Sequence, residues 1–270
     1  MKHRFITFLT DFGLTDDFVG TCHGVMKRLA PDVEIIDITH GISPQAVLQG
    51  ALVLRNTVPY MPEGVHLAVV DPGVGSSRRP IVLRDAAGRL YVGPDNGLLV
   101  PAAETEGIES AHELANPQYA LESVSRTFHG RDLFAPAAAH LALGVDPAEL
   151  GPPLGLDALV RLDLPVAEVS PGVVRAAVLY VDRFGNIQLN LTREDLESVG
   201  IAPGTRFELE ANGERYYATA ARTFADARPG EIVLYEDSYR NIAIAINRGS
   251  AAEMFASDAG QLLTLHLNAP

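Results

Sequence analysis

The chain has 270 residues, of which 47% are hydrophobic and 20% are charged. This balance predicts one or two globular domains and excludes a disordered or collagen-like protein. The formal net charge is −13, and the lysines and arginines form no basic cluster, so we expect no nucleic-acid partner. A cationic small molecule would instead be attracted.

The apolar segments and the cysteine content limit the cellular compartments that we expect for the protein. No apolar run is long enough to span a membrane, and the apolar segment 5–9 is interrupted by Asp11 too soon for a signal peptide. The single cysteine, Cys22, permits no internal disulfide, and it falls on the apolar positions of a predicted helix, so we expect it in the core. We therefore predict a soluble, cytoplasmic protein with no membrane partner.

The first part of the chain, 1–163, alternates strands and helices with a period of roughly thirty residues. In chain order, the predicted elements are a strand at 5–10, a helix at 18–29, a strand at 33–38, a helix at 44–58 that Pro44 opens, and a strand at 66–70. Right-handed crossovers of this kind build a mostly parallel sheet flanked by helices, which is an α/β domain.

Three polar residues follow the ends of these predicted strands: Asp11, His40 and Asp71. Open α/β sheets place their ligands at the carboxyl ends of parallel strands, so the three residues would share one functional edge. Each of them alone could equally cap a helix or form a turn. Their coincidence favours a site.

The composition changes near Leu162. Segment 164–172 is rich in proline and is typical of a linker. Beyond it, 173–270 contains short β-rich runs separated by Gly, Pro and Asn turns, which predicts a small all-β domain. The expected strands are 173–181, 187–191, 207–210, 216–220, 232–235, 242–246 and 262–267.

A glycine-punctuated loop follows the third strand, from Asp71 to Arg79. Gly73 and Gly75 would let its backbone approach a ligand closely, with a carboxylate at one end and a guanidinium at the other. The loop lacks the P-loop pattern, and the first turn lacks the dinucleotide fingerprint. We therefore expect neither a nucleoside triphosphate nor a dinucleotide.

Several further motifs are ordinary turns or caps when each is taken alone. These motifs span nearly the whole chain: Thr10-Asp11-Phe12-Gly13 with Asp16-Asp17, then 71–75, 94–99, Phe128-His129-Gly130-Arg131-Asp132, Phe184-Gly185-Asn186 and 223–226. In their order and spacing they resemble those of the S-adenosyl-L-methionine (SAM) hydroxide adenosyltransferase family, relatives of the fluorinating and chlorinating enzymes that act on the same substrate.

The resemblance implies an enzyme that attacks SAM at the ribose C5′ with water and releases adenosine and L-methionine. It also implies a homotrimer in which the α/β domain of one subunit and the C-terminal β-barrel of a neighbour enclose the substrate. We expect no cofactor and no catalytic metal, with SAM itself as the substrate.

The resemblance also assigns substrate-binding roles. Asp11 would bind both ribose hydroxyls, and the amide of Asn96 would lie at the substrate. Phe184, Asn186 and Phe224 would form the adenine pocket, Asp16 and Asp182 would meet the methionine ammonium, and Ser238 and Tyr239 would meet its carboxylate. The chain departs from the family at Arg240, where glycine usually follows the Ser-aromatic pair.

Asp71, Arg78 and His129 resemble the three residues that distinguish the water-using branch from its halide-using relatives. A sulfonium departs as a neutral sulfide, so the reaction mainly needs an aligned, partly deprotonated water. A carboxylate or an imidazole could take the proton while an arginine stabilises hydroxide. Arg78 is chosen over Arg79 because its offset from Asp71 fits the motif. The sequence leaves open whether Asp71 or His129 is the base.

Three other functions remain as alternatives. A metal-dependent hydrolase could use Asp11, His40, Asp71 and His129 as ligands. A non-catalytic nucleoside-binding protein could keep the ribose and adenine contacts without turnover. A halogenase is disfavoured because the carboxylate of Asp71 would repel a halide.

Overall fold

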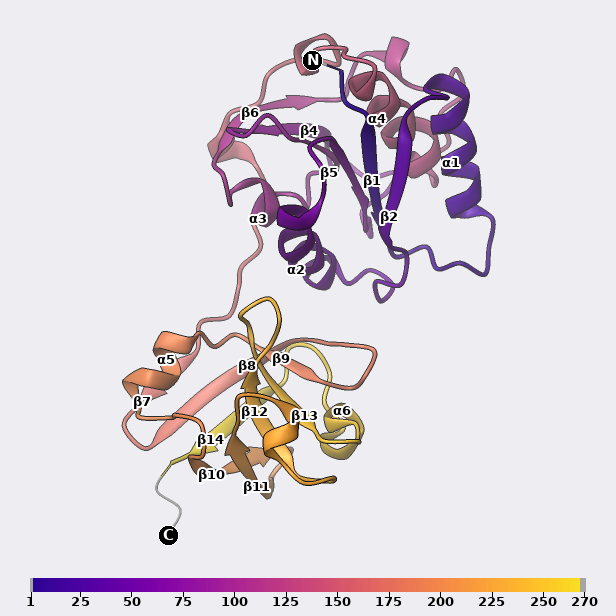
Figure 1. The fold of residues 1–270 in the computed structure, drawn as a ribbon. Coiled ribbons are helices and arrows are strands. Elements are labelled where there is room, and N and C mark those ends of the chain that lie inside the picture. The colour runs from indigo at the N-terminus through magenta and orange to yellow at the C-terminus, as the bar shows by residue number, and fades with distance from the viewer. Residues whose placement is uncertain (1, 268–270) are drawn as a thin grey trace. The chain divides into compact units, whose positions relative to one another are not determined.

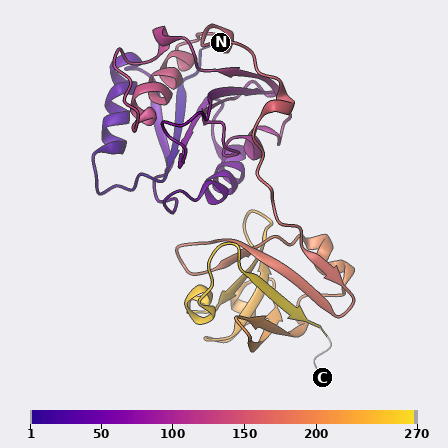
Figure 2. The same ribbon diagram turned by 180° about the vertical axis from the view of Figure 1, so that it is seen from behind.

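The computed structural model describes residues 2–267. The chain forms two compact units, Met1–Leu162 and Asp163–Pro270, each with its own hydrophobic core. Figures 1 and 2 show the two units from opposite sides.

The N-terminal unit is built on one six-stranded sheet in the order β2-β1-β3-β5-β4-β6. Neighbouring strands are parallel from β2 to β5, whereas β4 is antiparallel to both β5 and β6. The strands are β1 (Phe5–Thr10), β2 (Glu34–Thr39), β3 (Val65–Val69), β4 (Pro80–Asp85), β5 (Leu90–Pro94) and β6 (Ile108–Glu113).

Helices cover both faces of this sheet (Figures 1 and 2). Successive residues of β1 point to opposite faces, so Phe8 packs with α1 and α4 while Leu9 packs with α2 and α3. Cys22 is a fully buried residue of α1, which confirms its predicted place in the core. Burial raises the pKa of its thiol to about 12. The helices are α1 (Phe18–Leu29), α2 (Val47–Thr57), α3 (Val100–Ala103) and α4 (Ala135–Ala142), with short 3₁₀ turns η1 (Val58–Tyr60), η2 (Pro117–Tyr119), η4 (Pro147–Glu149) and η5 (Leu156–Ala158).

The predicted alternation is confirmed, with two differences. Helix α2 begins at Val47 rather than at Pro44, because Gln45 has a left-handed φ of 65° that a helix does not accept. Strands β4, β5 and β6 were not predicted, and β4 runs opposite to the other five strands of the mostly parallel sheet.

The C-terminal unit is a closed β-barrel of seven strands in the order β14-β10-β11-β12-β13-β9-β8, closed by pairing of β8 with β14. All neighbours are antiparallel except β11 and β12. The elements are β7 (Glu168–Ser170), β8 (Val173–Val181), β9 (Ile187–Leu189), α5 (Arg193–Ser198), β10 (Arg206–Ala211), β11 (Glu214–Ala220), η6 (Phe224–Asp226), β12 (Ile232–Glu236), β13 (Ile242–Ile246), α6 (Ala251–Phe255) and β14 (Leu262–His266).

The barrel confirms the predicted all-β class, and each of its seven strands overlaps a predicted run. Strand β7 pairs with β8 and lies within 164–172, the segment that the sequence predicts to be a linker. No helix within residues 2–267 is long and apolar enough to cross a membrane.

Candidate active site

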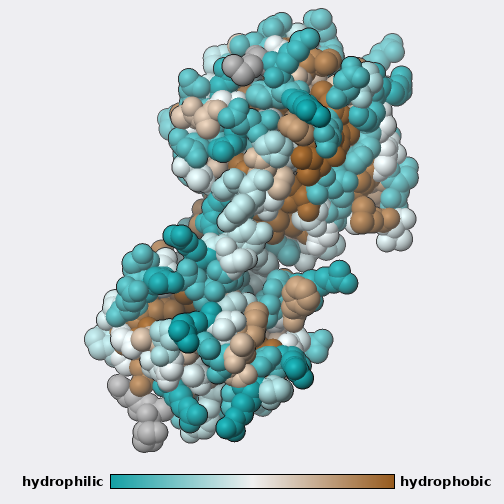
Figure 3. Space-filling view, in the orientation of Figure 1, coloured by the Kyte–Doolittle hydropathy of each residue, from teal (hydrophilic) through white to brown (hydrophobic). Residues whose placement is uncertain are grey.

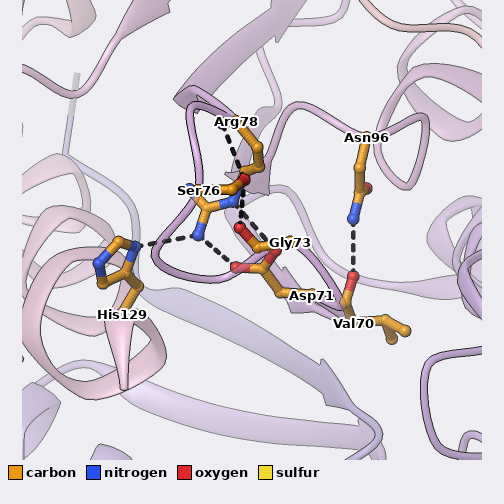
Figure 4. Close-up of polar contacts among 7 residues, drawn as sticks. All are labelled: Val70, Asp71, Gly73, Ser76, Arg78, Asn96 and His129. Carbon is orange, nitrogen blue, oxygen red and sulfur yellow. Dashed lines mark hydrogen bonds and ion pairs between the residues drawn. The ribbon is translucent and has the colours of Figure 1, made fainter. Parts of the chain in front are cut away.

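The loop that follows β3 carries two of the predicted catalytic residues. Arg78 folds back on Asp71: its Nε donates to Asp71 Oδ1 at 3.0 Å, and its Nη2 contacts Asp71 Oδ2. The two side chains are only 8% and 6% exposed, so solvent screens this charge pair weakly. Figure 4 shows the pair inside the curve of the loop.

His129 completes the group from a distant part of the chain. It precedes the short π-helix η3 (Gly130–Phe134), which leads into α4. Arg78 Nη2 donates to His129 Nδ1 at 3.0 Å (Figure 4). Because a guanidinium can only donate, Nδ1 must carry the lone pair, and the neutral ring is protonated at Nε2. Burial, and then the positive charge of Arg78, lower the pKa of His129.

The loop conformation depends on a glycine and a serine. Gly75 has a φ of +78°, and a Cβ there would lie 2.5 Å from the carbonyl oxygen of Arg126, so a side chain is excluded. Ser76 Oγ donates to the Gly73 carbonyl at 2.7 Å and accepts from the Arg78 N–H at 3.2 Å. These bonds set the backbone from which Arg78 reaches Asp71.

Two further contacts define the surroundings of Arg78. Its guanidinium lies over the ring of Phe134, 5.1 Å from the centroid, which favours the cation. Its Nη1 is buried and has no hydrogen-bond partner among residues 2–267. This N–H group is therefore available to an acceptor that enters the site. Phe134 is the last residue of the π-helix that leads into α4.

Arg79, the neighbouring arginine, faces a different carboxylate. Its Nε donates to Asp95 Oδ2 at 3.0 Å, and its Nη2 donates to the carbonyl oxygen of Ala158 at 2.5 Å. Arg78, not Arg79, contacts Asp71. The two arginines thus have separate roles, one in the loop cluster and one in holding the segment near residue 158.

Aromatic packing brings the first motif against the His129 motif. The rings of Phe12, Phe18 and Phe128 contact one another, with centroids 5.1 to 5.9 Å apart. A Cβ at Gly130 would lie 2.9 Å from Phe12 Cζ, so this glycine permits the approach. The sequence marked Phe12 and Phe128 only as motif members, and nothing in their spacing indicated this contact.

Asp11 follows β1 in this region. Its Oδ2 accepts from the N–H of Gln45 at 2.8 Å, which links the ends of β1 and α2. Its other carboxylate oxygen takes no part in that link and can accept from a ligand. Asp16, by contrast, lies exposed ahead of α1.

The side chain of Asn96 forms hydrogen bonds with neighbouring backbone groups. Its Nδ2 donates to the carbonyl of Val70 at 2.8 Å (Figure 4). Its Oδ1 accepts from the N–H of Leu98 at 3.2 Å. The side chain thereby holds the residue that precedes Asp71. This is a positioning contact, and the predicted substrate contact of Asn96 stays a prediction.

The barrel unit carries two turns of the same design. In Asp182–Asn186, Asp182 Oδ1 accepts from the N–H groups of Phe184 and Asn186 at 2.8 and 2.9 Å. Asn186 Nδ2 also donates to Asp182 Oδ2 at 2.7 Å. Phe184 is left 77% exposed, so the turn presents an aromatic side chain on an ordered backbone.

The second turn, Asp237–Asn241, repeats this arrangement. Asp237 Oδ1 accepts from the N–H groups of Tyr239 and Asn241 at 2.8 and 2.9 Å. The fourth position is left-handed in both turns, with a φ of 78° at Gly185 and 64° at Arg240. This conformation explains why glycine suits the position of Arg240.

The remaining predicted binding residues of the barrel lie at its surface. Ser238 and Tyr239 are exposed in the second turn, and Phe224 in η6 packs against Tyr235 with ring centroids 4.8 Å apart. Phe224 is 40% exposed. The structure therefore groups the predicted catalytic residues in the N-terminal unit and places the predicted adenine-binding side chains on barrel loops.

The four ligands of the alternative metal site do not come together. Asp71 and His129 both contact Arg78, and Asp11 binds the backbone of Gln45. Within residues 2–267, the cluster of metal-ligating side chains is a different one, His23, Asp37 and His40. Among the described residues, the four candidate ligands of the metal-dependent alternative are therefore not grouped around one point.

Comparison with known proteins identifies the family. Residues 6–151 match the SAM hydroxide adenosyltransferase N-terminal domain, and residues 176–264 match the C-terminal domain of the same family. An (R)-S-adenosyl-L-methionine hydrolase from Salinispora arenicola is 48% identical, with 96% of each chain covered. A fluorinase from an Actinoplanes species is 32% identical, again over 96% of each chain.

A solved structure supports the same relationship. The crystal structure of an uncharacterized conserved protein from Thermotoga maritima superposes with a TM-score of 0.89 at 34% identity, covering 97% of this chain and 99% of the other. The predicted family resemblance is confirmed. The chain belongs to the SAM hydroxide adenosyltransferase family.

Proposed function

We propose that this protein hydrolyses SAM at the ribose C5′, giving adenosine and L-methionine. The observation that carries the proposal is the cluster of Asp71, Arg78 and His129, in which the nearly buried Arg78 side chain contacts both other side chains. The relatives named as (R)-S-adenosyl-L-methionine hydrolases support the substrate, and their similarity extends over nearly the whole chain.

The reaction is a displacement at carbon. The water oxygen forms a bond to C5′ while the C5′–S bond breaks, and sulfur keeps the electron pair to become the neutral thioether of methionine. The leaving group needs no proton. The water must lose one proton, so the site needs an acceptor, an aligned water and a positive group beside the developing hydroxide.

The hydrogen bonds support one division of these tasks. His129 Nδ1 already accepts from Arg78, and its Nε2 carries the proton, so the neutral ring has no lone pair to offer the water. Asp71 keeps unused lone pairs on both oxygens and takes the proton. Arg78 Nη1, buried and without a partner among the described residues, donates to the water oxygen. His129 thus holds Arg78 in place.

Water is favoured over a halide for the same reasons. A halide at this position would lie beside the carboxylate of Asp71, and like charges in a weakly screened site repel strongly. The similarity to a fluorinase therefore reflects shared substrate and fold rather than a shared nucleophile.

Substrate binding is assigned to both units. Asp11 and Asp16 of the α/β unit, with Asp182, Phe184, Asn186, Phe224, Ser238 and Tyr239 of the barrel, surround the ribose, adenine and methionine. The exposed aromatic rings on the barrel support this assignment, since a flat purine would cover them.

A homotrimer with its sites at subunit contacts is part of the proposal. Hydrophobic residues reach the visible surface of each unit (Figure 3), and Leu14 and Phe18 of the α/β unit are 78% and 41% exposed. Such side chains suit a surface that another subunit covers. We also propose a cytoplasmic location, which the lone buried cysteine and lack of any disulfide support.

The decisive experiment is incubation of the purified chain with each sulfonium epimer of SAM in the presence of a chelator. We expect equal amounts of adenosine and methionine, with faster turnover of the (R) epimer because the relatives are named for it. In water labelled with heavy oxygen, the label should enter the 5′-hydroxyl of adenosine.

Several results would contradict the proposal. S-Adenosylhomocysteine would indicate methyl transfer, and a 5′-halogenated nucleoside would indicate a halide nucleophile. Binding without any product would indicate the non-catalytic alternative, and activity that chelation abolishes would indicate a catalytic metal. An active monomer in light scattering would contradict the trimer.

A further inference from the structure

A second group of titratable side chains lies between α1 and β2, outside the cluster of Asp71. His23 projects from α1, Asp37 from β2, and His40 follows the end of β2. His23 Nε2 lies 2.8 Å from Asp37 Oδ1, and His40 Nε2 lies 3.1 Å from the same oxygen. The proposed hydrolysis uses none of the three side chains.

His40 is the buried member of this cluster. Its side chain is 2% exposed, and its Nε2, although close to Asp37, makes no hydrogen bond of acceptable geometry within the described chain. Its Nδ1 is 2.8 Å from Thr10 Oγ1, and the ring packs edge-on against Phe8. The ring is therefore fixed with Nε2 directed at the cluster.

We propose that His23, Asp37 and His40 form a binding site for one divalent transition-metal ion of the zinc type. The ligands are the Nε2 atoms of both histidines and a carboxylate oxygen of Asp37, with water in the remaining position. Two imidazoles and a carboxylate favour zinc, nickel or copper over magnesium or calcium, which prefer oxygen ligands.

The distances suit this ion. The three ligand atoms lie within 4.8 Å of one another, whereas ligands of a tetrahedral zinc are about 3.3 Å apart at bond lengths of about 2.0–2.1 Å. Only a modest rearrangement is needed. His23 and Asp37 have side chains 32% and 41% exposed, so they can adjust around the fixed ring of His40 and leave an open path for the ion.

The hydrogen bonds around His40 resemble those around the histidine ligands of protein metal sites. Ligating histidines commonly have the other ring nitrogen hydrogen-bonded, which sets the tautomer and the ring orientation. Thr10 Oγ1 does this for His40 and also accepts from the N–H of Phe12 at 3.1 Å. The carbonyl of His40 accepts from the N–H of Gly13 at 2.8 Å, so the site is attached to the segment that contains Asp11.

The test uses the full chain after treatment with a chelator, with Zn²⁺ and Co²⁺ alone as probes. Equilibrium dialysis should give one bound Zn²⁺ per chain, and Co²⁺ should produce visible ligand-field absorption. His23→Gln retains a donor toward Asp37 but removes the nitrogen ligand, and it should weaken Zn²⁺ binding by at least about 100-fold, since even loss of a supporting bond costs 10–100-fold. Asp37→Asn should weaken binding as well.

His266→Gln is the matched control. His266 forms a histidine–carboxylate pair with Glu210 at 2.9 Å in the barrel unit but has no second histidine beside it. This variant should keep full Zn²⁺ binding. The proposal is wrong if the wild-type chain binds no Zn²⁺, or if His23→Gln binds it as tightly as wild type; the cluster is then two histidines hydrogen-bonded to one carboxylate. Either result leaves the proposed hydrolysis untouched.

Discussion

The α/β unit and the barrel unit present the side chains of the proposed site in opposite ways. In the α/β unit, Asp71 and Arg78 are almost fully buried and already bonded to each other and to His129. In the barrel, Phe184 and Tyr239 are 77% and 45% exposed on turns whose backbone is ordered by an aspartate. Under the proposed function, the catalytic group is assembled before substrate arrives, whereas the aromatic side chains of the barrel stay open to solvent until substrate covers them.

This difference follows from what each task needs. Stabilising a developing hydroxide requires charges that are already oriented, because reorientation during the reaction would raise the barrier. Binding a purine requires an aromatic face that water can leave, so the ring must be accessible before the ligand covers it. We therefore expect substitutions in the two units to change different constants.

The largest effect should come from the assembled group. Asp71→Asn removes the proton acceptor but keeps the shape, so kcat should fall by about 10²–10⁴-fold while KM changes much less. Steady-state kinetics with adenosine detection measures both constants. Because Asp71 and Arg78 act on one water and His129 holds Arg78, the losses should not add, so Asp71→Ala/His129→Ala should be little worse than the poorer single variant.

Arg79→Lys is the control for this group, because Arg79 binds Asp95 rather than Asp71. It should leave kcat near the wild-type value. Normal turnover in both Arg78→Ala and His129→Ala, with only affinity reduced, would show that the buried cluster is a binding element and would erase the contrast between the units.

Asp11 tests whether the α/β unit also contributes to binding. Asp11→Ala removes a charge-assisted contact that is present in both the bound substrate and the transition state, so affinity should fall by about 10–100-fold, with a smaller loss of kcat. Asp11→Asn should be milder. Calorimetric titration with a non-reactive product such as adenosine measures the loss, and unchanged affinity in Asp11→Ala would refute the ribose assignment.

Acid should affect the two units unequally. His66 is fully buried beside Thr7, and burial lowers its pKa to about 3. The unfolded chain takes up this proton near pH 6.5, so stability is present above that pH and is lost as the pH falls toward the folded pKa. At about 1.36 kcal/mol per pH unit, the α/β unit should lose about 2 kcal/mol between about pH 6.5 and about pH 5.

The barrel should escape this loss, because its buried polar side chains, Gln188 and Ser257, do not ionise in that range. Hydrogen exchange, corrected for the intrinsic pH dependence, measures each unit separately: protection should fall in β1 and β3 and persist in β12 and β13. His66→Gln should reduce the difference between the units, and an equal fall of protection in both units of the wild type would contradict the prediction.

Much of the fold could be predicted because its signals are local. The bounds of β1, β8 and β13 coincide with apolar runs in the sequence. Strands β4 and β5 were not predicted, although two apolar runs flank a turn at Gly88, where φ is +86°. That pattern is typical of a β-hairpin. The start of α2 depends on a bond between Gln45 and Asp11, which no local pattern contains.

The candidate site divides in the same way. The motif identified Asp71, Arg78 and His129, and the structure brings them into contact. The cluster of His23 with Asp37 arises only when α1 packs against β2, so spacing along the chain could not reveal it. The repeated Asp-x-aromatic-x-Asn pattern is visible in the sequence at both turns. It indicates how the backbone of each turn is hydrogen-bonded, but it does not indicate a catalytic or binding role.

The smallest expected effect concerns that repeated turn and how far the barrel's binding surface depends on its backbone. Arg240 occupies a left-handed conformation, φ 64°, at the position that Gly185 fills in the other turn. A side chain there costs roughly 1–2 kcal/mol, which glycine avoids at some cost in chain entropy, so Arg240→Gly should stabilise the barrel by about 0.5–1 kcal/mol. Urea unfolding followed by hydrogen exchange in β12 and β13 measures this gain.

Arg240→Ala keeps the backbone strain while removing the guanidinium, so it separates the two roles of Arg240. If both variants weaken SAM binding equally, Arg240 contacts the methionine carboxylate. If neither variant weakens it, the side chain contributes only backbone strain to the turn. A loss of stability in Arg240→Gly would show that contacts of the arginine side chain outweigh its backbone strain. The order of the turn would then depend on that side chain as well as on the aspartate.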